Sequence, residues 1–471
     1  MTHAAPQDPE TQHLPRTVGE LRAAGHTYRT VKQELRDNLL EQLRSGTPRF
    51  PGIVGYDDTV LPEVERAILA GHDLVLLGER GQGKTRLIRA LVDLLDEWTP
   101  VLPGSELNEH PLHPITPMAR ADEAEFGDER LVTWLHRSRR YGEKLATPDT
   151  SVGDLVGDVD PIRVAQGRTL GDPETVHYGL VPRANRGVFG LNELPDLAAR
   201  IQVALFNVLE ERDIQIRGYS LRLPLDLLLV ATANPEDYTN RGRIITPLKD
   251  RFGAEIRTHY QLDVVDEVEL IAQESAVVAS VPEHLVEVVA RFTRGLRESA
   301  SIDQRSGVSA RFSIAATEAV SASALRRSAR TGDDAVVARV CDVPGVVPTL
   351  LGKVEFEMGE EGREREVLDH LLRVAVAETY RSRLAGLDLT GFTALFEDGS
   401  VVETGELVPA AELLGQLGTV PGLSKVLDRL GHGDDASIGE TAAAVEFVLE
   451  GLHLTRRIDK DTVAGRTVYG A

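Results

Sequence analysis

Cysteine is almost absent from this chain of 471 residues, in which Cys341 is the single example. One cysteine excludes an internal disulfide framework, and it excludes a zinc site built on several cysteines. Positive charge is also scarce: 52 Lys and Arg residues stand against 74 Asp and Glu residues, a formal net charge of −22. An acidic surface repels phosphate backbones, so general nucleic-acid binding is disfavoured, although a local basic stripe remains open.

Long hydrophobic runs are missing as well. The most apolar stretch, residues 221–233, contains Arg222 and Asp226 and is much shorter than the ~20 residues that span a bilayer. The N-terminal residues show neither a basic segment nor an apolar segment of the kind that directs export. We therefore expect a cytoplasmic protein that makes no membrane contact.

The most informative stretch lies between residues 73 and 97. Residues 74–77 form the continuous apolar run that is typical of a buried parallel strand, and residues 87–95 carry Leu and Ile at helical spacing. Between them lies a glycine-rich segment that matches a complete phosphate loop: Gly78-Glu79-Arg80-Gly81-Gln82-Gly83-Lys84-Thr85. Strand, loop and helix in this order are the context that the motif requires.

The chemistry of this loop predicts binding of ATP with Mg²⁺. Its glycines let backbone N–H groups turn toward phosphate, Lys84 reaches the β- and γ-phosphates, and the Thr85 hydroxyl is a Mg²⁺ ligand. The chain holds only seven lysines, so a lysine at this position of the motif is not expected by chance from the composition.

Further apolar runs at residues 187–191 and 225–232, and a weaker one at 254–260, alternate with helical segments. This alternation predicts a mostly parallel sheet with helices on both faces. A segment of roughly ninety residues, acidic in character and rich in Pro and Gly, lies between the run at 74–77 with its helix and the run at 187–191, and an insertion of that size is usually functional. Its segment 106–144 suggests no chemistry, and we expect His110 and His113 to be surface residues.

Two strand ends carry polar residues suited to hydrolysis. Glu193 follows the run at 187–191 and would orient the attacking water. Asn192 occupies the place of an expected aspartate; its amide can bind a metal-bound water but carries no charge. An ordinary strand-to-helix junction with Asn192 as a cap is the alternative. Asn234 stands at the tip of the run at 227–235, where its amide could hold the water or the γ-phosphate.

Taken in order, these motifs resemble the AAA+ ATPases of the group that holds the MoxR proteins and the ATPase subunit of magnesium chelatase. The resemblance covers residues 50–260 and the segment 307–311, and it hardly touches residues 330–471. Its further marks are Phe50-Pro51-Gly52-Ile53-Val54-Gly55, Ala184-Asn185-Arg186-Gly187-Val188, Phe206-Asn207-Val208-Leu209-Glu210-Glu211-Arg212, Ala231-Thr232-Ala233-Asn234-Pro235, Pro247-Leu248-Lys249-Asp250-Arg251-Phe252 and Gly307-Val308-Ser309-Ala310-Arg311.

The resemblance implies roles for arginines. Arg251 would be an arginine finger that reaches the γ-phosphate of a neighbouring subunit, so a ring, commonly a hexamer, would complete the site. Arg311 would contact the γ-phosphate from a lid. Arg241 and Arg243 could share the finger role. For Arg251 and Arg311 the alternative is a solvated ion pair. Residues 150–180 would form an insert that touches substrate or partner.

The resemblance also implies the architecture. We expect an α/β fold: an AAA+ P-loop core with a mostly parallel five-stranded sheet, followed by a helical lid and a mostly helical C-terminal region. The expected divisions are a tail and helix at 1–48, the core with insertions at 49–262, the lid at 263–330 and a domain of unknown role at 331–471. Residues 392–402 suggest a β-hairpin around Asp398-Gly399, and the last sixty residues suggest helices.

Four functions stay open at this point. The first is an ATP-driven motor that remodels or loads a partner, typically a von Willebrand A-domain protein in this family. The second is the motor subunit of a magnesium chelatase that inserts Mg²⁺ into a porphyrin. The third is a transcriptional activator ATPase of the enhancer-binding class, but this sequence contains neither the Gly-Ala-Phe-Thr-Gly-Ala loop nor the helix-turn-helix of that class. The fourth is a nucleotide-binding scaffold without hydrolysis, which Asn192 suggests.

Overall fold

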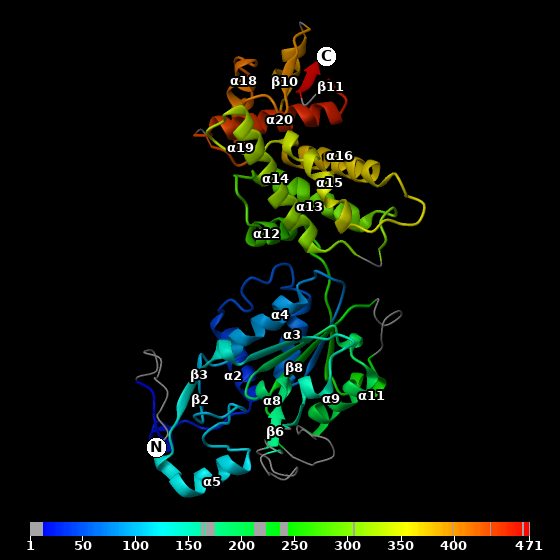
Figure 1. Ribbon diagram of the computed structural model, residues 1–471. Coiled ribbons are helices and arrows are strands. Elements are labelled where there is room, and N and C mark those ends of the chain that lie inside the picture. Colours follow the sequence, from blue (N-terminus) through cyan, green and yellow to red (C-terminus); the bar gives the residue numbers. More distant parts are fainter. Residues whose placement is uncertain are drawn as a thin grey trace. The chain divides into compact units, whose positions relative to one another are not determined.

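The structure is a computed structural model that divides into two compact units, residues 1–259 and 260–471 (Figure 1). The residues it describes are 13–160, 162, 165, 175–211, 223–235, 244–304, 307–397, 399–433, 435–463 and 466–470. The first unit contains two hydrophobic clusters, and the second unit contains its own.

A five-stranded sheet forms the centre of the first unit, with strands in the order β4–β7–β8–β1–β9, each pair parallel. The strands are β1 Leu74–Leu77, β4 Tyr141–Leu145, β7 Val188–Asn192, β8 Leu228–Ala233 and β9 Ala254–Arg257. The predicted five-stranded parallel sheet is therefore confirmed. Four of its strands coincide with the apolar runs, whereas β4 lies at the end of the acidic segment and was not predicted.

Helices cover both faces of this sheet, as predicted. Along β8, Leu228 and Val230 pack toward one core, and the intervening Leu229 and Ala231 pack toward the other, because successive side chains of a strand point to opposite faces. The first core is covered by α2 Val31–Ser45, α3 Val60–Ala70 and α4 Lys84–Ala90, and the second by α9 Ala199–Glu211 and α11 Thr246–Lys249.

Smaller elements surround the sheet. The described residues of this unit include antiparallel pairs of β2 Trp98–Val101 with β3 Thr133–His136 and of β5 Gly157–Val159 with β6 Val176–Tyr178. Short helices are α1 Val18–Ala23, α5 Pro117–Phe126, α6 Val152–Leu155, α8 Leu180–Arg183 and the 3-10 turns η2 Leu91–Leu94, η3 Gly127–Glu129, η4 Arg137–Arg139 and η6 Leu194–Asp196. The predicted insert at 150–180 thus contains α6, β5 and β6.

Buried ion pairs hold the N-terminal ends of two strands. Arg140, just before β4, donates to both carboxylate oxygens of Glu34 on α2 at 2.6 and 2.7 Å, and also to the carbonyl of Arg186 at 2.6 Å. Arg186, just before β7, pairs with Asp226. These ion pairs fix the points at which β4 and β7 begin. The polar residues at the C-terminal ends of the two strands are therefore also held in place.

His110 corrects the prediction that both histidines of the acidic segment lie on the surface. Its side chain is 2% exposed, and its Nε2 lies 3.3 Å from Nε2 of His26. Burial lowers the pKa of His110 to about 2, so the ring is neutral at physiological pH. His113 is exposed and stacks on Tyr28, with 4.4 Å between ring centroids. The ring of His110 is buried, although the segment around it is polar, because aromatic neighbours cover it.

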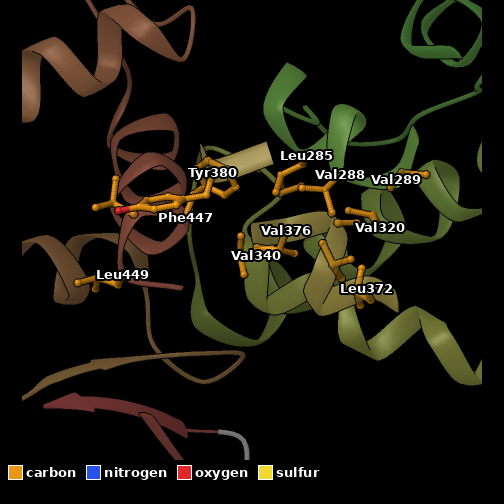
Figure 2. Packing of buried hydrophobic residues seen from close by; sticks show 14 of the residues in the cluster. Leu285, Val288, Val289, Val320, Val340, Leu372, Val376, Tyr380, Phe447 and Leu449 are labelled. Carbon is orange, nitrogen blue, oxygen red and sulfur yellow. The ribbon is translucent and has the colours of Figure 1, made fainter. Parts of the chain in front are cut away.

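The second unit is mostly helical and has one continuous core, which extends from Ile271 to Tyr469. Figure 2 shows part of this core, where Phe447 and Tyr380 lie edge to face with centroids 6.3 Å apart. The helices are α12 Val264–Glu274, α13 Glu283–Glu298, α14 Ala310–Thr331, α15 Val347–Leu350, α16 Glu364–Arg383, α17 Thr390–Thr393, α18 Ala410–Gly415, α19 Leu423–Arg429 and α20 Ile438–Leu454, with 3-10 turns η7 Val340–Asp342, η8 Pro344–Val346, η9 Leu351–Lys353 and η10 Ala394–Phe396.

The C-terminal region corrects two predictions. Residues 392–402 do not form a hairpin: α17 and η10 occupy 390–396, and Asp398 lies outside the described residues. Instead, β10 Val402–Thr404 pairs with β12 Arg466–Gly470, which also pairs with β11 Asp459–Val463. The last sixty residues are therefore only partly helical, because this strand pairing joins segments far apart in the chain. Among the described helices, none has the length and apolar content that a membrane crossing requires.

His284 on α13 makes the stability of this unit sensitive to acid. The ring is 0% exposed and packs against Phe447, and among the described residues neither of its nitrogens has a hydrogen-bond partner. Burial lowers its pKa from 6.5 to about 3, so the unfolded chain takes up a proton that the folded chain refuses. Stability is fully present above about pH 6.5 and is lost as the pH falls toward about 3.

We expect His284→Leu to remove this share of the pH dependence. Between about pH 7.5 and 5.5 the wild type should lose about 1.4 kcal/mol of stability through this ring, and the variant should not. Urea unfolding of the full chain at both pH values measures the difference. Equal losses in the two proteins would show that His284 takes up its proton without unfolding.

Candidate active site

The glycine-rich loop joins β1 to α4 and depends on its glycines. Gly81 and Gly83 both have φ +76°, a left-handed conformation that glycine adopts without strain. A Cβ on Gly78 would lie 2.0 Å from Oγ1 of Thr258 and 2.2 Å from Oε1 of Gln82. The loop therefore curls tightly at the C-terminal end of β1.

Thr258, directly after β9, and Tyr56, which precedes α3, hold the loop in place. The Thr258 hydroxyl donates to Oε1 of Gln82 at 2.7 Å, and the Tyr56 hydroxyl lies 2.5 Å from the Gln82 carbonyl oxygen and 2.8 Å from that of His259. Burial raises the pKa of Tyr56 above its ordinary value, so the phenol stays protonated as a donor. Two side chains outside the loop thus hold Gln82: Thr258 through the Gln82 side chain and Tyr56 through the Gln82 carbonyl.

Lys84 points into the loop, and its side chain is part of a buried network. The residue is 7% exposed, and its Nζ donates to the carbonyls of Gly78 and Glu79 and to Oδ1 of Asn234, the last two at 2.7 and 2.8 Å. Asn234 follows β8 and is 1% exposed. The lysine of the phosphate loop and the polar residue at the tip of β8 are therefore in direct contact.

Glu193 is the next member of this network. The Nδ2 group of Asn234 donates to Oε2 of Glu193 at 2.7 Å, and the Glu193 N–H donates to the Thr232 hydroxyl at 3.1 Å. The backbone of Glu193 is left-handed, with φ 57° and ψ 47°. For a residue with a side chain this conformation costs on the order of 1–3 kcal/mol and is concentrated at functional sites. The strained turn directs the carboxylate toward Asn234.

The two residues predicted to hold the metal ion also meet. The Thr85 hydroxyl donates to Oδ1 of Asn192 at 3.3 Å, and the Thr232 hydroxyl donates to the same oxygen at 3.3 Å. Asn192 is 7% exposed, and its Nδ2 donates to Oε1 of Glu143 at 3.0 Å. The structure thus adds Glu143, on the unpredicted strand β4, to the predicted set.

Glu143 has two further partners. The Tyr141 hydroxyl donates to its Oε2 at 2.6 Å, and Arg89 on α4 donates to both of its oxygens. Burial, followed by this carboxylate, raises the pKa of Tyr141, and the hydrogen bonds that Arg89 donates to Glu143 raise the pKa of Arg89. Nothing in the local sequence marks Glu143, because the edge strand Tyr-Gly-Glu-Lys-Leu lacks a continuous apolar run.

A cavity of about 370 Å³ borders the loop. Its lining is Leu77, Gly78, Glu79, Gln82, Pro235, Lys249, Glu255, Arg257 and Thr258. The volume is within the ordinary range for small-molecule sites.

The arginines are placed differently from the loop residues. Arg251, which follows α11, pairs with Glu210 on α9 at 2.9 Å and lies over the Phe206 ring, 5.0 Å from its centroid. It is half exposed, outside the Lys84 network. Arg311 lies in the first turn of α14 in the second unit and is exposed. Arg241 and Arg243 lie outside the described residues.

The residues present fit a magnesium–nucleotide complex. Across the part of the chain that the structure describes, no three His, Cys, Asp or Glu side chains are grouped closely enough to hold a metal ion. Magnesium commonly binds through one or two protein groups and substrate phosphates, so an all-protein cage is not needed. The Thr85 hydroxyl and the Asn192 carbonyl oxygen are suitable ligand types, and the tight glycine turn leaves its backbone free to approach phosphate.

Comparisons with known proteins find relatives of the segment that holds this site. Residues 73–252 match the family described as AAA domain (dynein-related subfamily). The magnesium-chelatase 38 kDa subunit of Cereibacter sphaeroides is 30% identical over 236 residues, which are 48% of this chain and 63% of that protein. The magnesium-chelatase subunit ChlI of Nephroselmis olivacea is 28% identical over 247 residues, 49% of this chain and 61% of that protein. The expected resemblance is confirmed, over less than two thirds of either relative.

Solved structures show weaker likeness. The complex between subunits BchI and BchD of magnesium chelatase, based on a cryo-EM reconstruction at 7.5 Å, contains a chain with 21% identity and a TM-score of 0.36. The match covers 68% of this chain and 98% of that one. A TM-score this low adds no weight to a functional assignment.

Proposed function

We propose that this chain, whose residues 73–252 are an AAA domain related to magnesium-chelatase subunits, is an ATP-binding and ATP-hydrolysing motor. We further propose that it acts as an oligomeric ring, commonly a hexamer in this family, and remodels or loads a partner protein. One observation carries the proposal. The continuous network Lys84–Asn234–Glu193 joins the phosphate loop after β1, through the end of β8, to a carboxylate at the end of β7.

The proposed binding roles follow from the loop. Its backbone N–H groups and the Lys84 ammonium bind phosphate oxygens, so Lys84 exchanges the carbonyls of Gly78 and Glu79 for the nucleotide. Thr85 and Asn192 hold the cation. When bound, Mg²⁺ neutralises phosphate charge as it does in other phosphoryl-transfer sites.

The proposed hydrolytic roles fall to Glu193, Asn234, Arg251 and Arg311. Glu193 orients the attacking water, and Asn234 couples that carboxylate to the occupancy of Lys84, since it bonds to both. Arg251 serves the neighbouring subunit. Its present ion pair with Glu210 is half exposed and worth only about 0–1 kcal/mol, so giving it up on assembly costs little. Arg311 approaches from residues 263–330, which we propose as a lid.

The partner is proposed by family resemblance to be a von Willebrand A-domain protein. An alternative is the motor subunit of a true magnesium chelatase, the assembly for which the relatives are named. A further alternative is a scaffold that binds ATP without hydrolysis, because Asn192 supplies no charge. Steady-state phosphate release by the wild type decides between motor and scaffold.

Glu193→Gln is expected to bind ATP normally and to hydrolyse it about 10²-fold more slowly. The amide keeps the shape of the side chain and can still accept the hydrogen bond from Asn234, but it loses the charge that orients water. Equilibrium binding of a fluorescent ATP analogue and phosphate release measure the two effects separately.

Asp196→Asn, three residues further along, is the matched control and should keep its turnover. If Glu193→Gln hydrolysed ATP at the wild-type rate while Asp196→Asn did not, the role of Glu193 would pass to Asp196.

A further inference from the structure

The proposed metal-binding side of this site lacks the negative charge that an aspartate at position 192 would supply. Asn192 stands where the resemblance leads one to expect an acid, and its side chain is neutral. Within the described residues around Asn192, its side-chain partners are Thr85, Thr232 and Glu143. Of these three, only Glu143 is ionisable as an acid. The carboxylate of Glu143, on the neighbouring strand β4, therefore accepts a hydrogen bond from the neutral amide of Asn192.

The hydrogen bonds fix which way the Asn192 amide points. A carboxylate can only accept, so the side of the amide that faces Glu143 must be the Nδ2 donor. The two threonine hydroxyls can donate, so they face Oδ1. This orientation presents an oxygen, the ligand type that Mg²⁺ prefers, to the hydroxyl of Thr85. Glu143 thus orients Asn192 and polarises it through a charge-assisted bond.

The protein also makes room for this arrangement. Glu143 lies opposite Gly190 in the parallel register of β4 and β7, on the face covered by α4. A Cβ on Gly190 would lie 3.1 Å from the Tyr141 hydroxyl and 3.2 Å from Cγ2 of Ile88. Glycine at this position leaves space for the Tyr141 hydroxyl, which holds the second oxygen of Glu143.

The ion pair with Arg89 does not explain this placement by itself. The Arg89 side chain is 62% exposed, and exposed ion pairs contribute little because water and salt screen them. The Glu143 side chain is 25% exposed and bonds inward to Asn192 as well as outward to Arg89. An ion pair serving only the surface would not need the inward bond.

We propose that Glu143 is the positioning carboxylate of the Mg²⁺ site: acting through the Asn192 amide, it supplies the negative charge that Asn192 lacks. This inference rests on the proposed function, because it concerns the cation that accompanies the nucleotide. It assigns the edge strand β4 a part in the site and explains how a neutral residue can stand at the end of β7.

The test measures cation binding without turnover. The full chain is loaded with a non-hydrolysable ATP analogue, and free Mn²⁺ is followed by electron paramagnetic resonance. Glu143→Gln keeps the size of the side chain and removes its charge, so Mn²⁺ affinity should fall about 10–100-fold, the usual effect of losing such a supporting group. Glu41→Gln, an exposed carboxylate on α2, is the control for net charge and should have no effect.

A rescue variant separates charge from structure. Glu143→Gln with Asn192→Asp places the carboxylate directly at the end of β7, and Mn²⁺ affinity should recover. A purely structural role for Glu143 would not be rescued in this way. Unchanged Mn²⁺ affinity in Glu143→Gln, or no recovery in the double variant, would overturn the proposal.

Nucleotide binding in EDTA keeps the two hypotheses distinguishable. If the wild type bound no nucleotide at all, the proposed function would fail before Glu143 was tested. If the wild type bound nucleotide and Glu143→Gln weakened that binding equally with and without metal ions, only the role of Glu143 would be refuted.

Discussion

Lys84→Ala should abolish useful ATP binding and, with it, hydrolysis. The ammonium contributes charge-assisted hydrogen bonds to phosphate of about 1.5–3 kcal/mol each, so losing two of them lowers affinity by about 100-fold or more. Fluorescent-nucleotide titration measures the affinity, and phosphate release should fall to background.

The fold should survive this substitution. Lys84 donates to two loop carbonyls and to Asn234, and Asn234 keeps its bond to Glu193 when the lysine is removed. Thermal unfolding followed by circular dichroism checks this point, and Lys353→Ala, an exposed lysine in the second unit, is the matched control. Nucleotide affinity within about twofold of the wild type would refute the phosphate-loop assignment.

Arg251→Ala should separate binding from turnover. The variant retains Lys84, Thr85 and Asn234 and therefore binds ATP, but hydrolysis should drop by about 10³–10⁵, the range that arginine fingers supply. The exposed Arg200→Ala at the other end of α9 is the control and should hydrolyse normally.

Mixing two inactive variants tests whether the arginine acts on a neighbour. Subunits with Lys84→Ala lack a working pocket but keep Arg251, and subunits with Arg251→Ala have the opposite defect. Mixed rings should regain part of the activity at interfaces where one variant supplies the pocket and the other the arginine. Wild-type activity per subunit should also rise with protein concentration as rings assemble. Co-assembly without any recovery, together with concentration-independent turnover, would contradict a shared site.

The sequence alone was sufficient for the parts of the site that are continuous in the chain. The loop from Gly78 to Thr85 was identifiable because its backbone conformation demands glycines at fixed positions, and φ +76° at Gly81 and Gly83 bears this out. Four strands were predicted because a parallel strand buried on both faces appears as a continuous apolar run. The fold class follows from these local patterns.

Tertiary structure decided which distant residues act together. Lys84 and Asn234 are 150 residues apart, and only the adjacency of β1 and β8 brings them into contact. The edge strand β4 carries polar residues and gave no apolar signal, so Glu143 became visible only when its register with β7 placed it beside Asn192. A local pattern reports the burial and backbone conformation of its own segment. Strand order and register determine which side chains from other segments lie beside it, and those neighbours set the charge of the site.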